Sequence, residues 1–438
     1  MVGSLPDDED GQCCIRGSVP RCPADRRMRT LAVVEFFPWP AMNGGQIRLA
    51  AALEALAELG ELDLLVLCDP DAATPAVPAG VTVGKIVTTP YPAADWSGWR
   101  MKWMLHRGVP LQVALRSGDS APRTAFASLA TGSPDLVWFS SARMFEWMGR
   151  PHTCPTVVDL IDLEDEKETR RARLIRKRPA SGVRGIVQRV LAEGQARLNA
   201  WDWRRLQLSV AASVDRVLLS SRLDARRLGA PNAEVVVNTI PRPLDPVGKG
   251  AVGDPIELLF QATFDYEPNV DGALWLTSEV APLIRSEIPG ARIRLVGHES
   301  AAVTALDHPP EVSVVGRVPS MEPELARADL VVVPIRFGSG TRLKIMEAFA
   351  HRVPVVSTSI GAEGLDAEDG VHLLIADSPA EFAAACKLLC STPPLRQRLV
   401  DAAEQLYLQR YTTSSATARV QELTRVLVPS APSPTQSA

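Results

Sequence analysis

The residues best suited to chemistry lie in the stretch 329–365, where a glycine turn leads from an apolar strand into a helix. The turn is Gly338-Ser339-Gly340, and Thr341 after it is a suitable N-cap for a helix that the spacing of apolar residues predicts over 342–351. A helix start of this kind presents unpaired amides and the positive end of the helix dipole. With Arg342 and Lys344 beside it, it favours an anion such as a phosphate group.

One carboxylate interrupts this cationic surface. Glu347 lies one turn deeper in the predicted helix, on the same face as Lys344 and His351. A carboxylate there is suited to accept hydrogen bonds from hydroxyl groups, such as those of a ribose. The combination predicts a site for a nucleotide diphosphate with its sugar. The alternative is an ordinary αβ unit whose helix is capped and whose charges are solvated.

The first half of the chain offers a second group of polar residues. Gly44-Gly45 precede a predicted helix, with Arg48 one turn further on, although glycine turns that open a helix are frequent. Asp159 and Asp162 end a predicted strand over 156–162, where the carboxyl ends of parallel strands would open into a cleft. The alternative for these carboxylates is a charged helix start.

The string GSGTRLKIMEAFA, followed by VPVVSTSIGAEGL, resembles the donor-site segment of the family 4 glycosyltransferases, in a subgroup with GSGTRLK in this place. The resemblance extends over residues 30–427 and is strongest in the second half. It implies a GT-B fold of two Rossmann-like domains facing a cleft. It also implies retaining transfer of a sugar from a nucleotide-diphosphate sugar to an acceptor hydroxyl, without metal or cofactor. The acceptor stays open among glycolipid, polysaccharide and natural product.

The resemblance also assigns roles to single residues. Members of the family carry two glutamates eight positions apart; Glu347 matches the second, which holds the ribose, whereas Ser339 stands in place of the first. Arg342 and Lys344 would stabilise the leaving diphosphate, and Asp162 is the candidate for the acceptor hydroxyl. The residues assigned to the donor are Gly338, Ser339, Gly340, Thr341, Glu347, Gly297 and Val318. The cleft loop of the first domain would comprise Gly44, Gly45 and Arg48.

Two other functions stay open on the same frame. One is a nucleotide-sugar epimerase or phosphorylase. The other is a binding protein without turnover, which the missing first glutamate would explain. An oxidoreductase is disfavoured, because no GxGxxG follows the first strand of either predicted domain.

Strands and helices alternate strictly through both halves of the chain, which predicts two doubly wound α/β domains. We expect a first domain over 28–245 and a second over 254–400, joined by a proline- and glycine-rich linker. A helix over 401–428 would cross back to the first domain, as in the family. Residues 1–27 and 429–438 are predicted to be disordered, with folding, and even translation, beginning at Met28.

Composition excludes several classes of protein. The chain has 438 residues, a net charge of −4 and no apolar run near the ~20 residues of a membrane span. The charge disfavours a nucleic-acid binder. Seven cysteines without a disulfide framework indicate a reducing cytoplasm.

Two segments could form surfaces instead of core. Residues 170–205 are rich in arginine, which predicts either a solvated helix face or an amphipathic surface that contacts anionic lipid at the inner face of a membrane. Trp96, Trp99 and Trp103 recur at helical spacing with Met101 and Met104. Such a stripe is more often core than an apolar lining or a membrane patch.

Overall fold

The computed structural model describes residues 27–41, 44–68, 76–98, 101, 108–150, 154–177, 181–298, 300–338 and 340–429. The predicted disorder of the two ends falls outside these residues, apart from residues 27 and 429. Ser339, Trp99, Trp103 and Met104 also lie outside them. The prediction that the tryptophan stripe is core is wrong for its described members, since Trp96 and Met101 are both exposed.

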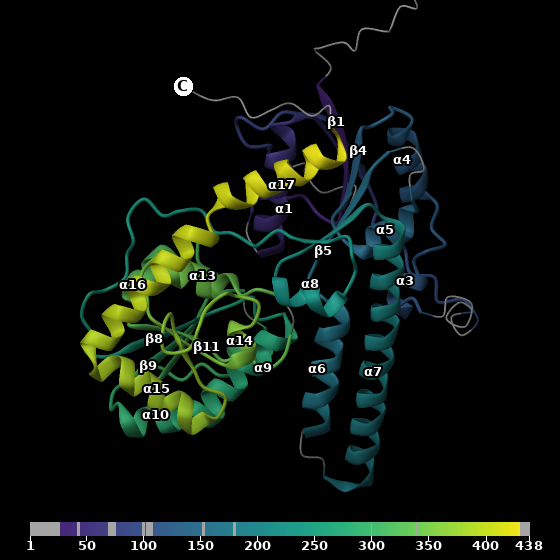
Figure 1. Cartoon of the computed structure of the whole chain (residues 1–438). Helices are drawn as coiled ribbons and strands as arrows, with labels where there is room; N and C mark the ends of the chain where they lie inside the picture. The colour runs from purple at the N-terminus through teal and green to yellow at the C-terminus, as the bar shows by residue number, and fades with distance from the viewer. Residues whose placement is uncertain are drawn as a thin grey trace, which may run out of the picture.

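Seven parallel strands form the sheet of the first domain, in the order β3-β2-β1-β4-β5-β6-β7 (Figure 1). They arise from the apolar runs of the sequence, because strands of a parallel sheet are covered on both faces. Between β1 and β4 the strand order reverses, which leaves a crevice at their carboxyl ends. Their bounds are β1 Met28–Val34, β2 Gly60–Leu67, β3 Val83–Thr89, β4 Leu136–Phe139, β5 Thr156–Ile161, β6 Arg216–Leu219 and β7 Ala233–Val235.

Helices cover both faces of this sheet. Residues of β1 alternate between two cores: Ala32 packs with α1 on one face, and Leu31 and Val33 pack with α5 and α7 on the other. The helices at residues 111–148 were not predicted from the sequence. The bounds are α1 Gly44–Ala57, α3 Leu111–Ala114, α4 Ala121–Ala130, α5 Ala142–Met148, α6 Glu164–Lys177, α7 Gly182–Ser213 and α8 Arg222–Leu228.

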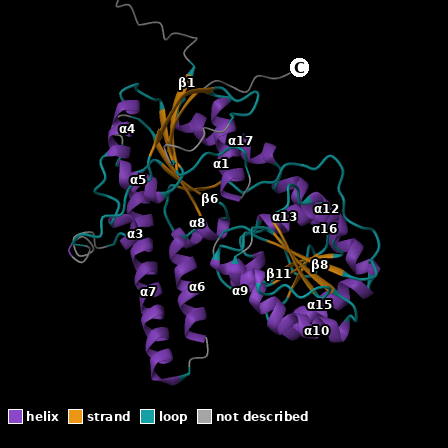
Figure 2. Cartoon of the chain, turned by 180° about the vertical axis from the view of Figure 1, so that it is seen from behind, coloured by secondary structure: helices purple, strands orange, loops and turns teal. Residues whose placement is uncertain are grey.

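The second sheet is also parallel, in the order β10-β9-β8-β11-β12-β13, and it reverses between β8 and β11 (Figure 2). The predicted α/β architecture of two doubly wound sheets is therefore confirmed. The strands are β8 Glu257–Gln261, β9 Arg292–Val296, β10 Val312–Gly316, β11 Leu330–Val333, β12 Val355–Ser357 and β13 Leu374–Ile375. The helices between them are α9 Glu267–Trp275, α10 Ala281–Glu287, α11 Ala301–Thr304, α12 Glu322–Arg327, α13 Leu343–Ala350, α14 Ser359–Ala362 and α15 Pro379–Ser391.

The single helix predicted at the C-terminus is two helices, α16 Pro393–Arg410 and α17 Thr413–Leu427. The chain bends at Tyr411, whose carbonyl accepts a hydrogen bond at 3.0 Å from the amide of Ile240, near the end of the first domain. After the bend α17 packs on α1 of the first domain, where Gln421 Nε2 donates to Glu58 Oε2 at 2.6 Å. The crossing back is therefore present, but the expected continuous helix is not, because the amide of Ile240 pairs with the carbonyl at the bend.

A buried carboxylate ties the linker to the second sheet. Asp329, which precedes β11, is fully buried. It accepts hydrogen bonds from the amides of Gly253 and Glu257, both at 2.8 Å, and from Lys249 Nζ at 3.2 Å. Asp329 therefore joins the linker and the first residue of β8 to the start of β11.

We expect Asp329→Ala to lower the free energy of unfolding by about 2–4 kcal/mol, because a buried amide at Glu257 and a half-buried amide at Gly253 lose their acceptor. Urea unfolding followed by tryptophan fluorescence measures this loss. Asp245→Asn, at an exposed position of the linker, is the control and should change stability little. Equal stability of the Asp329 variant and the control would contradict the proposed role of Asp329.

Candidate functional site

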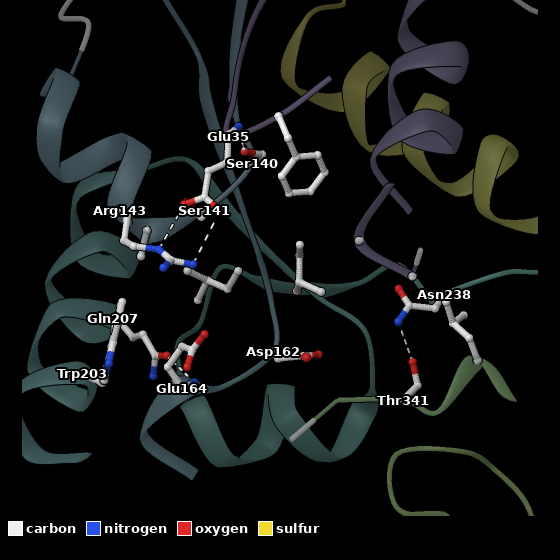
Figure 3. Close-up of a pocket in the computed structure, with 17 residues that line it drawn as sticks. Glu35, Ser140, Ser141, Arg143, Asp162, Glu164, Trp203, Gln207, Asn238 and Thr341 are labelled. Atoms are coloured by element: carbon white, nitrogen blue, oxygen red, sulfur yellow. Dashed lines mark hydrogen bonds and ion pairs between the residues drawn. The ribbon is translucent and has the colours of Figure 1, made fainter. Parts of the chain in front are cut away.

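The start of α13 faces the first domain across the cleft. Gly340 lies so close to Asp162 that a Cβ atom added to the glycine would be 1.9 Å from the Asp162 carboxylate. Gly340 also has a φ of +79°, which side-chain-bearing residues rarely adopt. Next to it, Thr341 Oγ1 accepts a hydrogen bond from Asn238 Nδ2 at 2.7 Å (Figure 3). The glycine turn and Asp162, predicted separately, are therefore in direct contact.

Thr341 is not the N-cap, contrary to the prediction. The cap position is Arg342, and among the described residues no side-chain capping hydrogen bond is made to α13, which begins at Leu343. The hydroxyl of Thr341 accepts instead from Asn238 in the first domain. A helix start that no side chain caps keeps its amides available for an anion.

An ion cluster between the domains holds the glycine turn. Arg170 of α6 donates through Nη1 to the carbonyl of Gly338 at 2.7 Å and through Nη2 to Glu363 Oε1 at 2.6 Å. Arg227 of α8 also donates to Glu363. Both arginines lower the pKa of Glu363 against the effect of its burial. The sequence did not predict this cluster, because Arg170 belongs to a run of arginines for which the prediction was a solvated face or an amphipathic surface.

Asp162 follows a strained end of β5. Ile161 has a φ of +60°, an uncommon conformation for a β-branched residue, and such strain concentrates at functional sites. Burial raises the pKa of Asp162 to about 6, against the opposing charge of Arg342. Its carboxyl group can therefore exist in either protonation state near neutral pH, which suits a group that exchanges protons.

The cations of α13 lie close together. Burial lowers the pKa of Lys344 to about 7, with a further contribution from the charge of Arg342. Burial likewise lowers the pKa of Arg342. The Lys344 ammonium donates to Asn269 Oδ1 at 3.0 Å. A diphosphate bound at this helix start would place negative charge next to both desolvated cations.

Glu347 lies at the carboxyl end of β8, as a ribose-binding role requires. Its Oε2 accepts a hydrogen bond from Gln261 Nε2 at 2.6 Å. Burial raises its pKa, and the hydrogen bond from Gln261 opposes that shift. Gln261 ends β8 next to the reversal of strand order, where ligands of open α/β sheets bind.

A cavity of 290 Å³ lies between the domains (Figure 3). From the second domain it is lined by Thr341 and Leu343, and from the first by Asp162, by Gly44-Gly45 and by residues that follow β1 and β4. The predicted glycine loop therefore belongs to the cleft. The α1 and α13 starts nearly touch, since a Cβ atom on Gly44 would be 2.6 Å from Leu343 Cδ1.

The polar wall of this cavity was not predicted from the sequence. Glu35, directly after β1, is 3.0 Å from Arg143 Nε of α5 and accepts from Ser141 Oγ at 3.2 Å. Ser140, Ser141 and Arg143 all line the cavity, after β4. A carboxylate at the end of the apolar run LAVVEF was the available signal.

Arg48 does not line this cavity. Its guanidinium is buried and binds both carboxylate oxygens of Asp159, at 2.8 and 2.9 Å, together with the Val236 carbonyl and Asn238 Oδ1. These contacts join α1 to β5 and to the segment after β7. The expected place of Arg48 in the cleft loop is therefore corrected: it supports Asn238, which in turn contacts Thr341.

Gly297 and Val318 lie elsewhere in the second domain. A Cβ atom on Gly297 would be 1.9 Å from the Ala262 carbonyl oxygen, and its φ is +138°, so the close approach of the loops after β8 and β9 requires glycine. Val318 packs half-buried against the core of the second domain. Neither residue lines the described cavity.

Comparison with known sequences gives a family match within the second domain and a match to a bacterial protein. Residues 255–392 match the family described as Glycosyl transferases group 1. A protein of Klebsiella pneumoniae described as "Uncharacterized 44.6 kDa protein in cps region" is 27% identical over 136 residues, which are 29% of this chain and 35% of that protein. The match therefore spans about a third of that relative's length.

Comparison with solved structures extends over nearly the whole chain. Anabaena Alr3699/HepE in complex with UDP and glucose is similar with a TM-score of 0.59 at 13% identity, over 91% of this chain and 99% of that one. The sucrose-phosphate synthase (tll1590) of Thermosynechococcus elongatus gives 0.60 at 16%, with the same coverage. The lipopolysaccharide outer core galactosyltransferase WaaB gives 0.53 at 11%, over 91% and 100%. The chain therefore has the GT-B fold, and its second domain matches the group 1 glycosyl transferases.

Proposed function

We propose that this protein is a glycosyltransferase that moves a sugar from a nucleotide-diphosphate sugar to an acceptor hydroxyl, with retention of anomeric configuration and without a metal. The observation that carries the proposal is the uncapped, cationic start of α13, which meets Asp162 across the interdomain cleft. The group 1 match over this segment supports the same reaction.

In this proposal the second domain holds the donor. The first-turn amides of α13, Arg342 and Lys344 bind the diphosphate and stabilise the charge that develops as the sugar leaves. Glu347, held by Gln261, accepts hydrogen bonds from the ribose. Gly340 allows the Asp162 carboxylate of the first domain to lie directly against the turn.

The first domain holds the acceptor. Asp162 lies at the cavity between the domains, next to the turn that would face the reacting sugar. Its pKa of about 6 suits a carboxylate that accepts a hydrogen bond or a proton from the acceptor hydroxyl. The Glu35–Arg143 wall is available to orient the polar groups of the acceptor.

A UDP-sugar is the first donor to test, because the similar structure of HepE contains UDP and glucose. The acceptor is a glycolipid, a polysaccharide or a natural product. A thermal-shift panel of UDP-, GDP-, ADP- and TDP-sugars identifies the donor, since a ligand that binds the folded state raises apparent stability. Hydrolysis of that donor without acceptor then shows sugar transfer to water, and NMR of products reports anomeric configuration.

Glu347→Ala should weaken binding of that donor at least about tenfold, because hydrogen bonds to a charged acceptor are lost. Isothermal titration calorimetry measures the change, with the exposed Glu279→Ala as control. Unchanged affinity of Glu347→Ala for the donor would contradict the proposed contact between Glu347 and the ribose. An epimeric nucleotide sugar as product, or binding without turnover with every acceptor screened, would replace the transferase by an epimerase or by a binding protein.

Donor affinity should fall as the pH rises above 7. The lowered pKa of Lys344, about 7, means that its ammonium is present below that pH and is lost above it. The loss of affinity approaches tenfold per pH unit between pH 7 and 9, if the donor binds only the protonated form. Lys344→Gln should bind more weakly and show no such dependence, whereas the exposed Lys387→Gln should keep it. A flat wild-type profile would contradict a role for Lys344 in binding.

Turnover should rise with pH through about 6, as Asp162 loses its proton. Asp162→Asn should lower kcat about a hundredfold or more and lose this limb of the pH profile, with donor affinity nearly unchanged. Steady-state kinetics from pH 5 to pH 8 measure both effects. Glu164→Gln, in the same cavity, is the matched control; loss of the limb in this variant instead would move the role to Glu164.

A further inference from the structure

The helices α6 and α7 project from the first domain as an antiparallel hairpin whose end lies apart from both sheets (Figures 1 and 2). Ala172, Ile175 and Ala196 form a small core between the two helices. At 32 residues α7 is about 48 Å long, far longer than covering the sheet requires. The part of the hairpin that lies away from both sheets therefore does not contribute to the core of the first domain. We refer to residues 173–177 and 181–191 as the hairpin tip.

The hairpin tip exposes an apolar stripe. Val183, Ile186, Val187, Val190 and Leu191 follow the i, i+3, i+4, i+7, i+8 pattern of one helix face. All are exposed, Val183 to 80% and Leu191 to 68%. Leu198 and Trp201 continue the same face toward the body and are also exposed. The face turned to α6 carries the buried Ala196 instead, so the stripe has no partner among the described residues.

The charges around the stripe all have one sign. Between Glu168 and Glu193 the sequence contains no acidic residue. The tip carries Arg173, Arg176, Lys177, Arg184 and Arg189. Arg173, Arg176, Lys177 and Arg184 form no ion pair or hydrogen bond with any described residue. A second copy of this chain would bring like charges together if it packed on the same stripe about a twofold axis. An anionic bilayer offers phosphates to the cations and acyl chains to the stripe.

The arginines of the predicted basic stretch 170–205 do not form one surface. Arg170 is buried in the cluster with Glu363, and Arg171 pairs with Glu267 of the second domain at 2.9 Å. Arg204 donates to the carbonyls of Arg227 and Leu228. Nearer the body, Arg197 pairs with Glu193 and Arg205 lies over the Trp201 ring, whereas Arg173, Arg176, Lys177 and Arg184 at the tip have no ion pair with a described residue and lie beside exposed apolar side chains. The alternative of a membrane contact, which the sequence leaves open beside a solvated face for the stretch 170–205, therefore concerns its tip.

We propose that the hairpin tip docks on an anionic phospholipid bilayer, with α7 lying in the interface and its stripe from Val183 to Leu191 entering the headgroup region. The contact is peripheral, because no described helix is long and apolar enough to cross a membrane. It tethers the catalytic cleft near the membrane surface through the rigid base of α6, which carries Arg170. The tip itself takes no part in sugar transfer.

Vesicle flotation of the full chain tests the proposal. The protein should float with vesicles of equal parts phosphatidylglycerol and phosphatidylcholine, and not with phosphatidylcholine alone, and added salt should weaken the binding. Arg173→Glu with Arg176→Glu should reduce binding at least about tenfold, since each basic residue near such a surface contributes about fivefold. Ile186→Ser with Val190→Ser should also reduce it, because less apolar surface enters the interface.

Two control double variants make the same changes in charge and in polarity at exposed positions outside the hairpin tip. Arg242→Glu with Arg398→Glu changes the net charge equally, and Leu274→Ser with Leu388→Ser removes as many exposed apolar side chains; both should bind as the wild type does. All four double variants should keep the wild-type circular dichroism and melting temperature. The proposal is overturned if binding shows no preference for anionic lipid or if the controls lose it equally. A dimer in light scattering that Ile186→Ser with Val190→Ser dissolves, without vesicle binding, would overturn it as well.

Discussion

The contact between the Asp162 carboxylate and Gly340 fixes how the two domains meet. Nothing larger than a hydrogen atom fits on the Cα atom of residue 340 without displacing the carboxylate. Gly340 has a positive φ, and so does Ile161, the residue that precedes Asp162. Such strain persists only where the surrounding structure holds it. Here Arg170 holds the carbonyl of Gly338 on one side, and Asn238 holds Thr341 on the other.

Electrostatics explains why this arrangement is poised for a ligand. Asp162 is buried, which favours its neutral form, while Lys344 and Arg342 are desolvated in the same way and lose stability as cations. A diphosphate at the start of α13 would favour the charged forms of Arg342 and Lys344. Its charge would offset part of the desolvation free energy that burial of these two cations costs in the free protein. Binding energy and protonation are therefore coupled, which is typical of sites that stabilise developing charge.

The fold was predictable from the sequence because buried parallel strands require apolar runs, and the predicted alternation of strands and helices is present in both domains. The string GSGTRLK predicted the helix start that faces the cleft. The sequence could not show which arginine does what. Arg170 and Arg173 lie three residues apart in α6, yet one is buried between domains and the other is exposed at the tip. Their difference depends on Glu363, nearly two hundred residues away, which no local pattern reveals.

The same reasoning explains the correction at Arg48. A cation one turn into a glycine-led helix is suited to a phosphate, but its neighbour in space, Asp159, is supplied by a strand more than a hundred residues later. Arg48 already forms a bidentate pair with Asp159 and donates to two further acceptors, and these contacts hold its guanidinium away from the cleft. Its contribution to the site passes through Asn238, which binds both Arg48 and Thr341. Arg48 thus acts as a positioning residue: it fixes the amide that the first domain presents to the start of α13.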